Sequence, residues 1–226
     1  MRPLLPRLWR WLGIGVLLMM LVPFPLIVVL RVFEPPTTML ILLRTVTRLL
    51  DGERPFYPRR QPVPMTRISS HLRRAVLAAE DARFYRHNGF DFHEIARAFD
   101  DYEQGKPLRG ASTITQQTAK NLFLWDGRSW LRKGLEAYLT VVLEIIVPKD
   151  RILELYLNLV EWGDAVFGAE MAAQVHYGKA AAALSRQEAA HLAAILPNPR
   201  GWRVDDPVAH RRARIILGRM SRQVAP

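Results

Sequence analysis

The chain has 226 residues, half of them hydrophobic, and a formal net charge of +11 at pH 7. This length suits one membrane segment plus one domain of ordinary size, and the apolar content excludes an intrinsically disordered chain. The absence of cysteine excludes disulfides, thiol nucleophiles and thiolate metal sites. The positive charge alone suits nucleic acid, an anionic membrane or a phosphate-bearing substrate equally well.

The N-terminal segment has the features of a membrane anchor. Residues 11–30 contain no charged side chain, and a helix of this length spans about 30 Å of hydrocarbon. Arg2, Arg7 and Arg10 precede the apolar run without any acidic residue. This charge distribution predicts a cytoplasmic N-terminus over residues 1–10 and an exported main domain.

A cleaved signal peptide is the alternative interpretation of the same segment. The apolar run is long for a signal peptide, and residues 30–34 offer no small-residue cleavage site. We therefore expect an uncleaved transmembrane anchor over residues 11–33. Pro23 and Pro25 should kink it, which membrane helices tolerate.

A connector is expected over residues 34–61, before a main domain over residues 62–226. Residues 39–50 are mostly apolar, with Arg44 and Arg48 four positions apart, and this run is too short to cross a membrane again. An amphipathic helix packed on the domain or lying at the membrane surface fits this pattern. The prolines that follow lead into the main domain.

Apolar side chains of the main domain recur at helical spacing. A helix capped by Ser69 ends at Glu80, which places this carboxylate at the helix end. Caps and flanking prolines predict further helices over residues 129–147, 149–160, 185–196 and from 207 onward. No convincing strand or internal repeat is present, so the expected fold class is mainly α.

Two polar segments form the candidate functional site. Residues 80–89 crowd acidic, aromatic and imidazole groups together, and residues 110–117 form a run of small and hydroxyl-bearing side chains. Neither segment is typical of a core or of an ordinary loop. Polar groups at this density need partners, and a ligand is a natural one.

The chain resembles the peptidoglycan glycosyltransferases of family 51, most closely their monofunctional, membrane-anchored members. The resemblance covers residues 62–199 and rests on five motifs in order. These are Glu80-Asp81 with Phe84, His87 and Gly89; Gly110 to Gln117 with Lys120-Asn121-Leu122-Phe123; Arg132-Lys133-x-x-Glu136; Ile152-Leu153-x-x-Tyr156-Leu157-Asn158 with Gly163; and Leu192 to Pro197 with Pro199. Ala111 and Thr118 depart from the family pattern, which affects the expected loop geometry but not the expected activity.

The resemblance implies a lysozyme-like helical domain with a smaller membrane-facing lobe. It implies transfer of a growing lipid-linked glycan onto lipid II with inversion, releasing undecaprenyl diphosphate. Serine-transpeptidase signatures are absent from the sequence, so a separate transpeptidase among the cell-wall synthesis proteins would cross-link the product. The implied location is the inner membrane, single-pass, with a periplasmic catalytic domain and no nucleic-acid partner.

The motif matches imply a role for each site residue. Glu80 is the general base on the acceptor 4-hydroxyl, and Glu136 is the second essential carboxylate at the donor site. Lys120, Arg128 and Lys133 match the positions that hold the donor diphosphate. The remaining matches are contacts to sugar and phosphate by Ser112 and Gln116, and shaping of the site by Asp81, Phe84, His87 and Gly89.

We expect no required cofactor. His87, His93 and His176 lack convincing ligand spacing, so a metal site built by histidines is not expected. A divalent cation, Mg²⁺ or Mn²⁺, bridging carboxylate and diphosphate is left open.

The same residues also allow structural roles or a different function. Glu80 could form a salt bridge with Arg83, Glu136 could form a surface ion pair with Arg132, and the basic residues could simply be solvated. A lysozyme-like hydrolase would also use a glutamate, but it has no use for a diphosphate clamp. A non-catalytic membrane scaffold would not need Glu80 at all.

Overall fold

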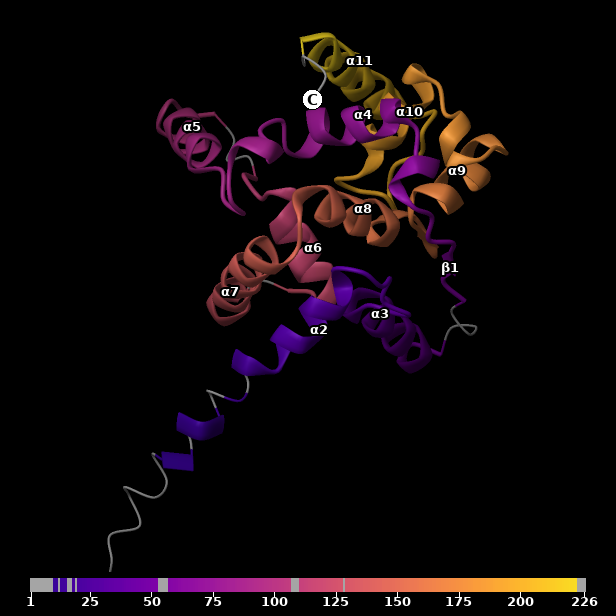
Figure 1. Cartoon of the computed structure of the whole chain (residues 1–226). Helices are drawn as coiled ribbons and strands as arrows, with labels where there is room; N and C mark the ends of the chain where they lie inside the picture. Colours follow the sequence, from indigo (N-terminus) through magenta and orange to yellow (C-terminus); the bar gives the residue numbers. More distant parts are fainter. Residues whose placement is uncertain are drawn as a thin grey trace, which may run out of the picture.

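The computed structural model describes residues 10–11, 13–15, 18, 20–52, 57–106, 110–127 and 129–222. It is mainly helical, as predicted, and it also contains a small sheet (Figure 1). The helices are α2 (Pro23–Leu30), α3 (Met39–Leu50), α4 (Ser70–Glu80), α5 (Phe92–Glu103), α6 (Ile114–Phe123), α7 (Trp130–Ile146), α8 (Lys149–Leu159), α9 (Ala169–Tyr177), α10 (Arg186–Ile195) and α11 (Pro207–Arg222). Short 3₁₀ helices lie at Met65–Arg67, Phe84–Arg86 and Ala181–Ala183.

The predicted helix starts are confirmed by their capping contacts. The Ser69 side chain accepts a hydrogen bond from the backbone of α4, and Ser129 does the same for α7. Ser185 and Glu188 form the expected capping box at the start of α10. Each contact satisfies a backbone N–H that has no partner inside its own helix.

Helix α6 lies at the centre of the fold and corrects one expectation. It packs against α3, α7 and α8, and most of its residues are buried (Figure 1). From Thr113 to Gln116 the polar run is therefore part of the core, whereas Gly110 and Ser112 remain exposed. Its hydroxyl groups can be buried because they are hydrogen-bonded: Thr115 donates to Glu144 Oε1 at 2.5 Å, and Thr118 donates to the Ile114 carbonyl at 2.8 Å.

Helices α4, α10 and α11 pack together in the upper part of the molecule, while α5 stands to one side (Figure 1). The sequence analysis placed no helix over α5, α6 or α9. In α5, Phe92, Ile95, Phe99 and Tyr102 recur at helical spacing but are exposed, and the helix buries only Ala98.

A sheet of three short strands also went unpredicted. β1 (Arg59–Arg60) runs parallel to β3 (Val166–Phe167), and β2 (Glu161–Gly163) runs antiparallel to β3. Strands of two or three residues are too short to show alternation in a sequence. They join the connector to the segment after α8.

The N-terminal helix α2 lies against α7 at the lower end of the domain and buries Ile27 and Leu30 (Figure 1). Among the described residues, no helix is both long and apolar enough to cross a membrane. Positions 12, 16, 17 and 19 of the expected anchor, and residues 1–9 before it, lie outside the described residues. The C-terminal end of α2 is tied to the domain, because Arg151 binds the Leu30 carbonyl at 3.0 Å and Glu34 at 2.7 Å.

Helix α3 is amphipathic, as expected. Its Leu42, Val46 and Leu49 side chains are exposed. On its other side, Arg44 lies 3.3 Å from Asp126 and 3.5 Å from Glu161. One apolar face is thus turned outward, while Leu40 and Ile41 are buried against Phe167 and Arg44 binds the domain.

Candidate active site

Glu80 ends α4 at the edge of a cavity. Helix α4 buries Leu72 and Val76 in the core, whereas the Glu80 side chain is only partly buried and lines a cavity of about 600 Å³. Burial raises the pKa of the Glu80 carboxyl above the ordinary glutamate value. A hydrogen bond from Gln117 and the positive charge of Arg212 act in the opposite direction.

Glu80 is connected to the core by a chain of hydrogen bonds. Gln117 Nε2 donates to Glu80 Oε2 at 2.9 Å, and the Tyr156 hydroxyl donates to Gln117 Oε1 at 3.1 Å. In the described part of the chain, Arg83 pairs with Asp91 at 3.3 Å rather than with Glu80. The carboxylate therefore has a neutral amide, and not a cation, as its direct partner.

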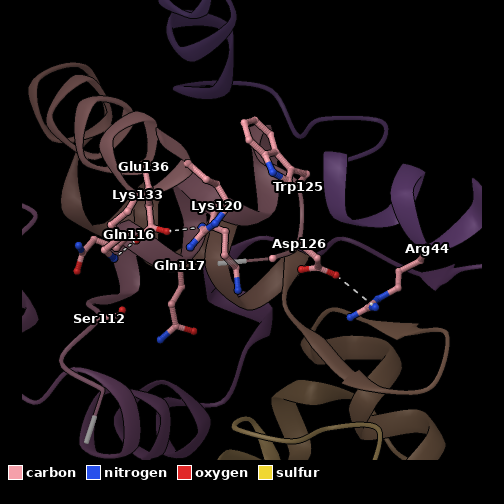
Figure 2. A pocket seen from close by; sticks show the side chains of 11 residues that line it. Arg44, Ser112, Gln116, Gln117, Lys120, Trp125, Asp126, Lys133 and Glu136 are labelled. Carbon is pink, nitrogen blue, oxygen red and sulfur yellow. Dashed lines mark hydrogen bonds and ion pairs between the residues drawn. The ribbon is translucent and has the colours of Figure 1, made fainter. Parts of the chain in front are cut away.

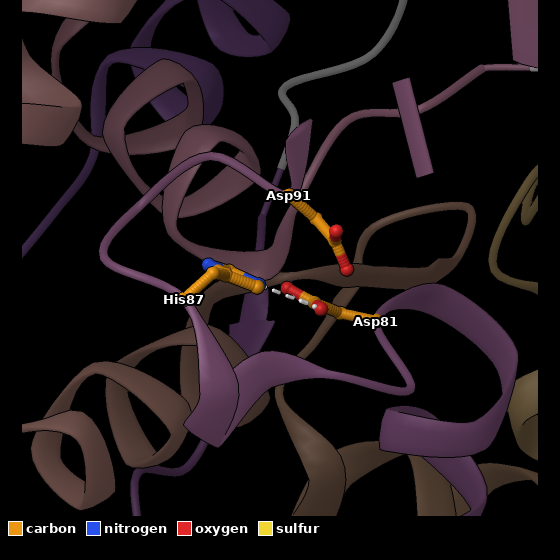
Figure 3. A group of neighbouring side chains, drawn as sticks. All are labelled: Asp81, His87 and Asp91. Atoms are coloured by element: carbon orange, nitrogen blue, oxygen red, sulfur yellow. Dashed lines mark hydrogen bonds and ion pairs between the residues drawn. The ribbon is translucent and has the colours of Figure 1, made fainter. Parts of the chain in front are cut away.

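Asp81 contacts both the segment after α4 and the start of α6. Figure 3 shows its carboxylate beside His87 and Asp91. His87 Nε2 lies 2.9 Å from Asp81 Oδ1, and the Ile114 backbone N–H donates to Asp81 Oδ2 at 3.0 Å. A carboxylate at a helix N-terminus is favourably placed in the field of the helix dipole. The contact fixes the start of α6 relative to the end of α4, which fits a site-shaping role.

Asp81, His87 and Asp91 each offer one ligand atom within 4.8 Å of the others. Protein groups already use these atoms, since Asp81 binds His87 and Ile114, and Asp91 binds the Glu94 N–H at 3.0 Å. The Arg83 guanidinium against Asp91 would also oppose a cation. The geometry is that of a hydrogen-bonded network.

Phe84 and Gly89 shape the same region from the core side. The Phe84 side chain is buried and meets the His87 ring edge-on, with 6.3 Å between ring centroids. Gly89 has φ of 87°, and a Cβ at this position would lie 2.7 Å from Thr140 Cγ2. Glycine is favoured here because a side chain would meet Thr140 and because φ is positive. The Gly89 carbonyl accepts a hydrogen bond of 2.6 Å from the Thr113 hydroxyl.

A second cavity, of about 700 Å³, lies between α6 and α7 and is rich in cations (Figure 2). Lys120 comes from α6, and Arg132 and Lys133 come from the first turn of α7. The predicted site residues on its wall are Ser112, Gln116, Lys120, Lys133 and Glu136. Arg128, the remaining predicted phosphate ligand, lies outside the described residues.

Glu136 holds two of these cations. Arg132 donates to its Oε2 at 2.8 Å, and the Lys133 ammonium contacts its Oε1. The expected pair with Arg132 is therefore present, but it is not a surface pair, because Glu136 is only 4% exposed. Both oxygens of this carboxylate are engaged by cations.

The two cavities meet at Ser112, which lines both. Glu80 lines one cavity and Gln117 lines the other, so their hydrogen bond runs between them. The arrangement places a carboxylate with a raised pKa next to a cationic recess. Such a pairing can remove a proton from one group while balancing negative charge on another.

Comparisons with known proteins agree with this geometry. The family model for transglycosylases matches residues 48–221. The chain belongs to the transglycosylase family. The resemblance predicted from the motifs is therefore confirmed, and with it the mainly helical fold class.

Three relatives of this family member are named biosynthetic peptidoglycan transglycosylase. The protein of Pseudomonas fluorescens (strain SBW25) is 52% identical over 198 residues, covering 87% of this chain and 82% of the relative. That of Ectopseudomonas mendocina (strain ymp) is 50% identical over 205 residues, covering 90% and 84%. That of Shewanella amazonensis (strain ATCC BAA-1098 / SB2B) is 45% identical over 214 residues, covering 94% and 86%.

Gln116 was predicted from its motif to contact sugar and phosphate, whereas its neighbour Gln117 was given no role. The structure places Gln116 in a capping box with Thr113, where its Oε1 accepts the Thr113 N–H at 3.0 Å. The pattern Thr-x-x-Gln is itself a helix-start signature. Gln116 thus forms the cap and also lines the cationic cavity, together with Gln117.

Arg44 and Tyr156 had no comparable signal for a place in the site. Arg44 lines the cationic cavity from α3, outside all five motifs. Tyr156 falls inside a motif, but its position on α8 reads equally well as core.

Proposed function

We propose that this chain polymerises peptidoglycan glycan strands from lipid II by inverting glycosyl transfer, with Glu80 as the general base. The observation that carries the proposal is the junction of two cavities at Ser112, one lined by Glu80 and the other by cations. Family membership and the names of its relatives place the chain among enzymes that build peptidoglycan.

The acceptor hydroxyl is a poor nucleophile until a base takes its proton, and a raised pKa suits Glu80 to this task. The lipid-linked diphosphate must leave the anomeric carbon of the donor sugar. Lys120, Lys133 and Arg128 would balance its negative charge. Glu136 would hold Lys133 and Arg132 in place for that contact. A single displacement inverts the anomeric centre without a covalent intermediate.

The substrate carries a long lipid tail, so the enzyme must work at a membrane. We include in the proposal an anchor over residues 11–33, a cytoplasmic N-terminus and a periplasmic catalytic domain in the inner membrane. The exposed apolar face of α3 supports this placement, because it could lie at the headgroup level. A lysozyme-like helical domain with α2 and α3 as the membrane-facing lobe fits the same arrangement.

The deciding experiment incubates purified full-length protein in detergent with labelled lipid II and separates the products on a gel. We expect a ladder of uncross-linked polymer from the wild type and none from Glu80→Gln. A folded sample that yields no polymer at any divalent-cation level would contradict the proposal. Cleavage of preformed glycan would favour the hydrolase instead.

Topology is tested separately. Protease added to spheroplasts should digest the Glu80-containing domain from outside. Protection of that domain would overturn the proposed orientation and the side on which substrate is used.

A further inference from the structure

The hydrogen-bonded chain from Tyr156 to Glu80 has a defined direction. An ionised carboxylate only accepts hydrogen bonds, an amide oxygen only accepts, and an amide nitrogen only donates. The Gln117 nitrogen must therefore face Glu80 when Glu80 is ionised. The Gln117 oxygen then faces Tyr156, whose hydroxyl supplies the proton for the 3.1 Å contact.

Tyr156 is suited to fixing this direction. It lies on α8, is 1% exposed, and stays protonated because burial raises its pKa well above the ordinary tyrosine value. A hydroxyl can donate or accept, but with Glu80 ionised one arrangement satisfies the whole chain: Gln117 Nε2 donates to Glu80, and Tyr156 donates to Gln117 Oε1. Without that hydroxyl, the amide loses a hydrogen bond that holds it in this orientation.

The position of Gln117 has a second consequence. Its contact at 2.9 Å engages Glu80 Oε2, while Oε1 takes no hydrogen bond from any described residue. Glu80 lines the 600 Å³ cavity, so the unengaged oxygen is available for a substrate hydroxyl.

We propose that Tyr156 and Gln117 are positioning residues: Tyr156 orients the Gln117 amide, and the amide holds Glu80 ionised with Oε1 left for the acceptor hydroxyl. The inference rests on the proposed role of Glu80 as base. It adds two residues that act on the reaction through Glu80.

Other charged groups also surround Glu80. Asp81 follows it in the chain and Arg212 faces it from α11. The remaining charged residues on the cavity wall are Asp91, Glu94, Arg97, Asp101 and Arg219. All of them stay in place when Tyr156 or Gln117 is changed, so a difference between pH profiles reports on the chain itself.

The test measures kcat and KM for polymerisation against pH in Gln117→Met, Tyr156→Phe and the double variant. Loss of the amide donor should raise the pKa of Glu80, so the acidic limb of the kcat profile should move up by about one pH unit in Gln117→Met. Tyr156→Phe should move it in the same direction by less. The double variant should match Gln117→Met alone, because Tyr156 acts through Gln117.

Tyr177→Phe is the matched control, since it removes a hydroxyl that contacts the Glu188 carbonyl at 3.5 Å and has no link to Glu80. Its limb should coincide with that of the wild type. Thermal melting midpoints show whether a variant has a folding defect rather than only a shifted pH profile. If Tyr156→Phe is unstable, the test rests on Gln117→Met, because Gln117 is only half-buried.

An unmoved limb in Gln117→Met, or fully multiplicative effects in the double variant, would overturn the inference. That outcome is distinct from failure of the proposed function, in which the unmodified protein makes no polymer at all.

Discussion

Glu80 and Glu136 are the same side chain in opposite surroundings. Glu80 has a neutral amide as its direct partner at 2.9 Å, and burial raises its pKa. Glu136 is more deeply buried, yet both of its oxygens contact cations, Arg132 at 2.8 Å and Lys133. The first carboxylate has a raised pKa and no charged group in direct contact, whereas both oxygens of the second are occupied by ion pairs.

The difference teaches that burial alone does not make a carboxylate a base. What matters is whether the partner is neutral or charged, because a cation stabilises the ionised form and makes protonation unfavourable. On this basis the two cavities have different roles in the proposed reaction. One accepts a proton, and the other presents positive charge.

The largest expected effect follows from removing the base. Glu80→Gln keeps the size of the side chain but cannot accept a proton, so turnover should fall about 10²-fold or more. The melting midpoint should change little, because no buried cation loses its partner. Asp205→Asn, at an exposed site, is the control. Near-normal turnover would remove Glu80 from the catalytic role.

Glu136→Gln should affect stability as well as activity. The change leaves Arg132 and Lys133 without a charged partner, which should cost about 2 kcal/mol of unfolding free energy. Denaturant unfolding measures this loss, and activity should fall in parallel. If Glu136→Gln instead behaved like Glu80→Gln, with activity lost and stability kept, the contrast between the two carboxylates would be wrong.

Lys120→Ala probes the cationic cavity without disturbing Glu136. Loss of one charge-assisted contact to the diphosphate should weaken substrate binding by about 1.5–3 kcal/mol, seen as a higher KM. Stability should hold, because the side chain lines an open cavity. A KM equal to that of the wild type would place the diphosphate elsewhere.

The smallest expected effect is the contribution of Glu188 to the pH dependence of stability. The side-chain hydrogen bond from Lys179 and the backbone N–H of Ser185 lower the pKa of Glu188 to about 2. Its contribution to stability is thus present above the ordinary value of 4.5 and is lost as pH falls towards 2. Glu80 has the opposite sign: its raised pKa stabilises the fold at low pH, and that contribution is lost as pH rises through the folded-state pKa.

Thermal melts of Glu188→Gln and wild type between pH 5 and pH 2 check the first sign. The variant can keep the capping contact but should lose part of the acid dependence, with polymerisation at neutral pH unchanged. An identical acid dependence would contradict the assignment.

Local spacing determined much of this protein. Serine caps and flanking prolines predicted where α4, α7, α8, α10 and α11 begin, because each cap acts within its own first turn. The motifs placed Glu80 at a helix end and Glu136 one turn from Arg132 for the same reason. The short strands and the burial of α6 could not be predicted, since they depend on what packs against them. Helix α5 was missed although Asp91 caps it and its apolar residues have helical spacing.

What only the tertiary structure decided is the partner of Glu80. Gln117 reaches Glu80 from another helix, and Tyr156 reaches Gln117 from a third, so no spacing along the chain encodes either contact. The sequence motifs by themselves identified two glutamates and a set of basic residues as site residues. Packing decided that Glu80 received a neutral partner, because its contacts join residues that meet only when α4, α6 and α8 fold together. The ion pairs of Glu136 lie within α7 and follow from local spacing.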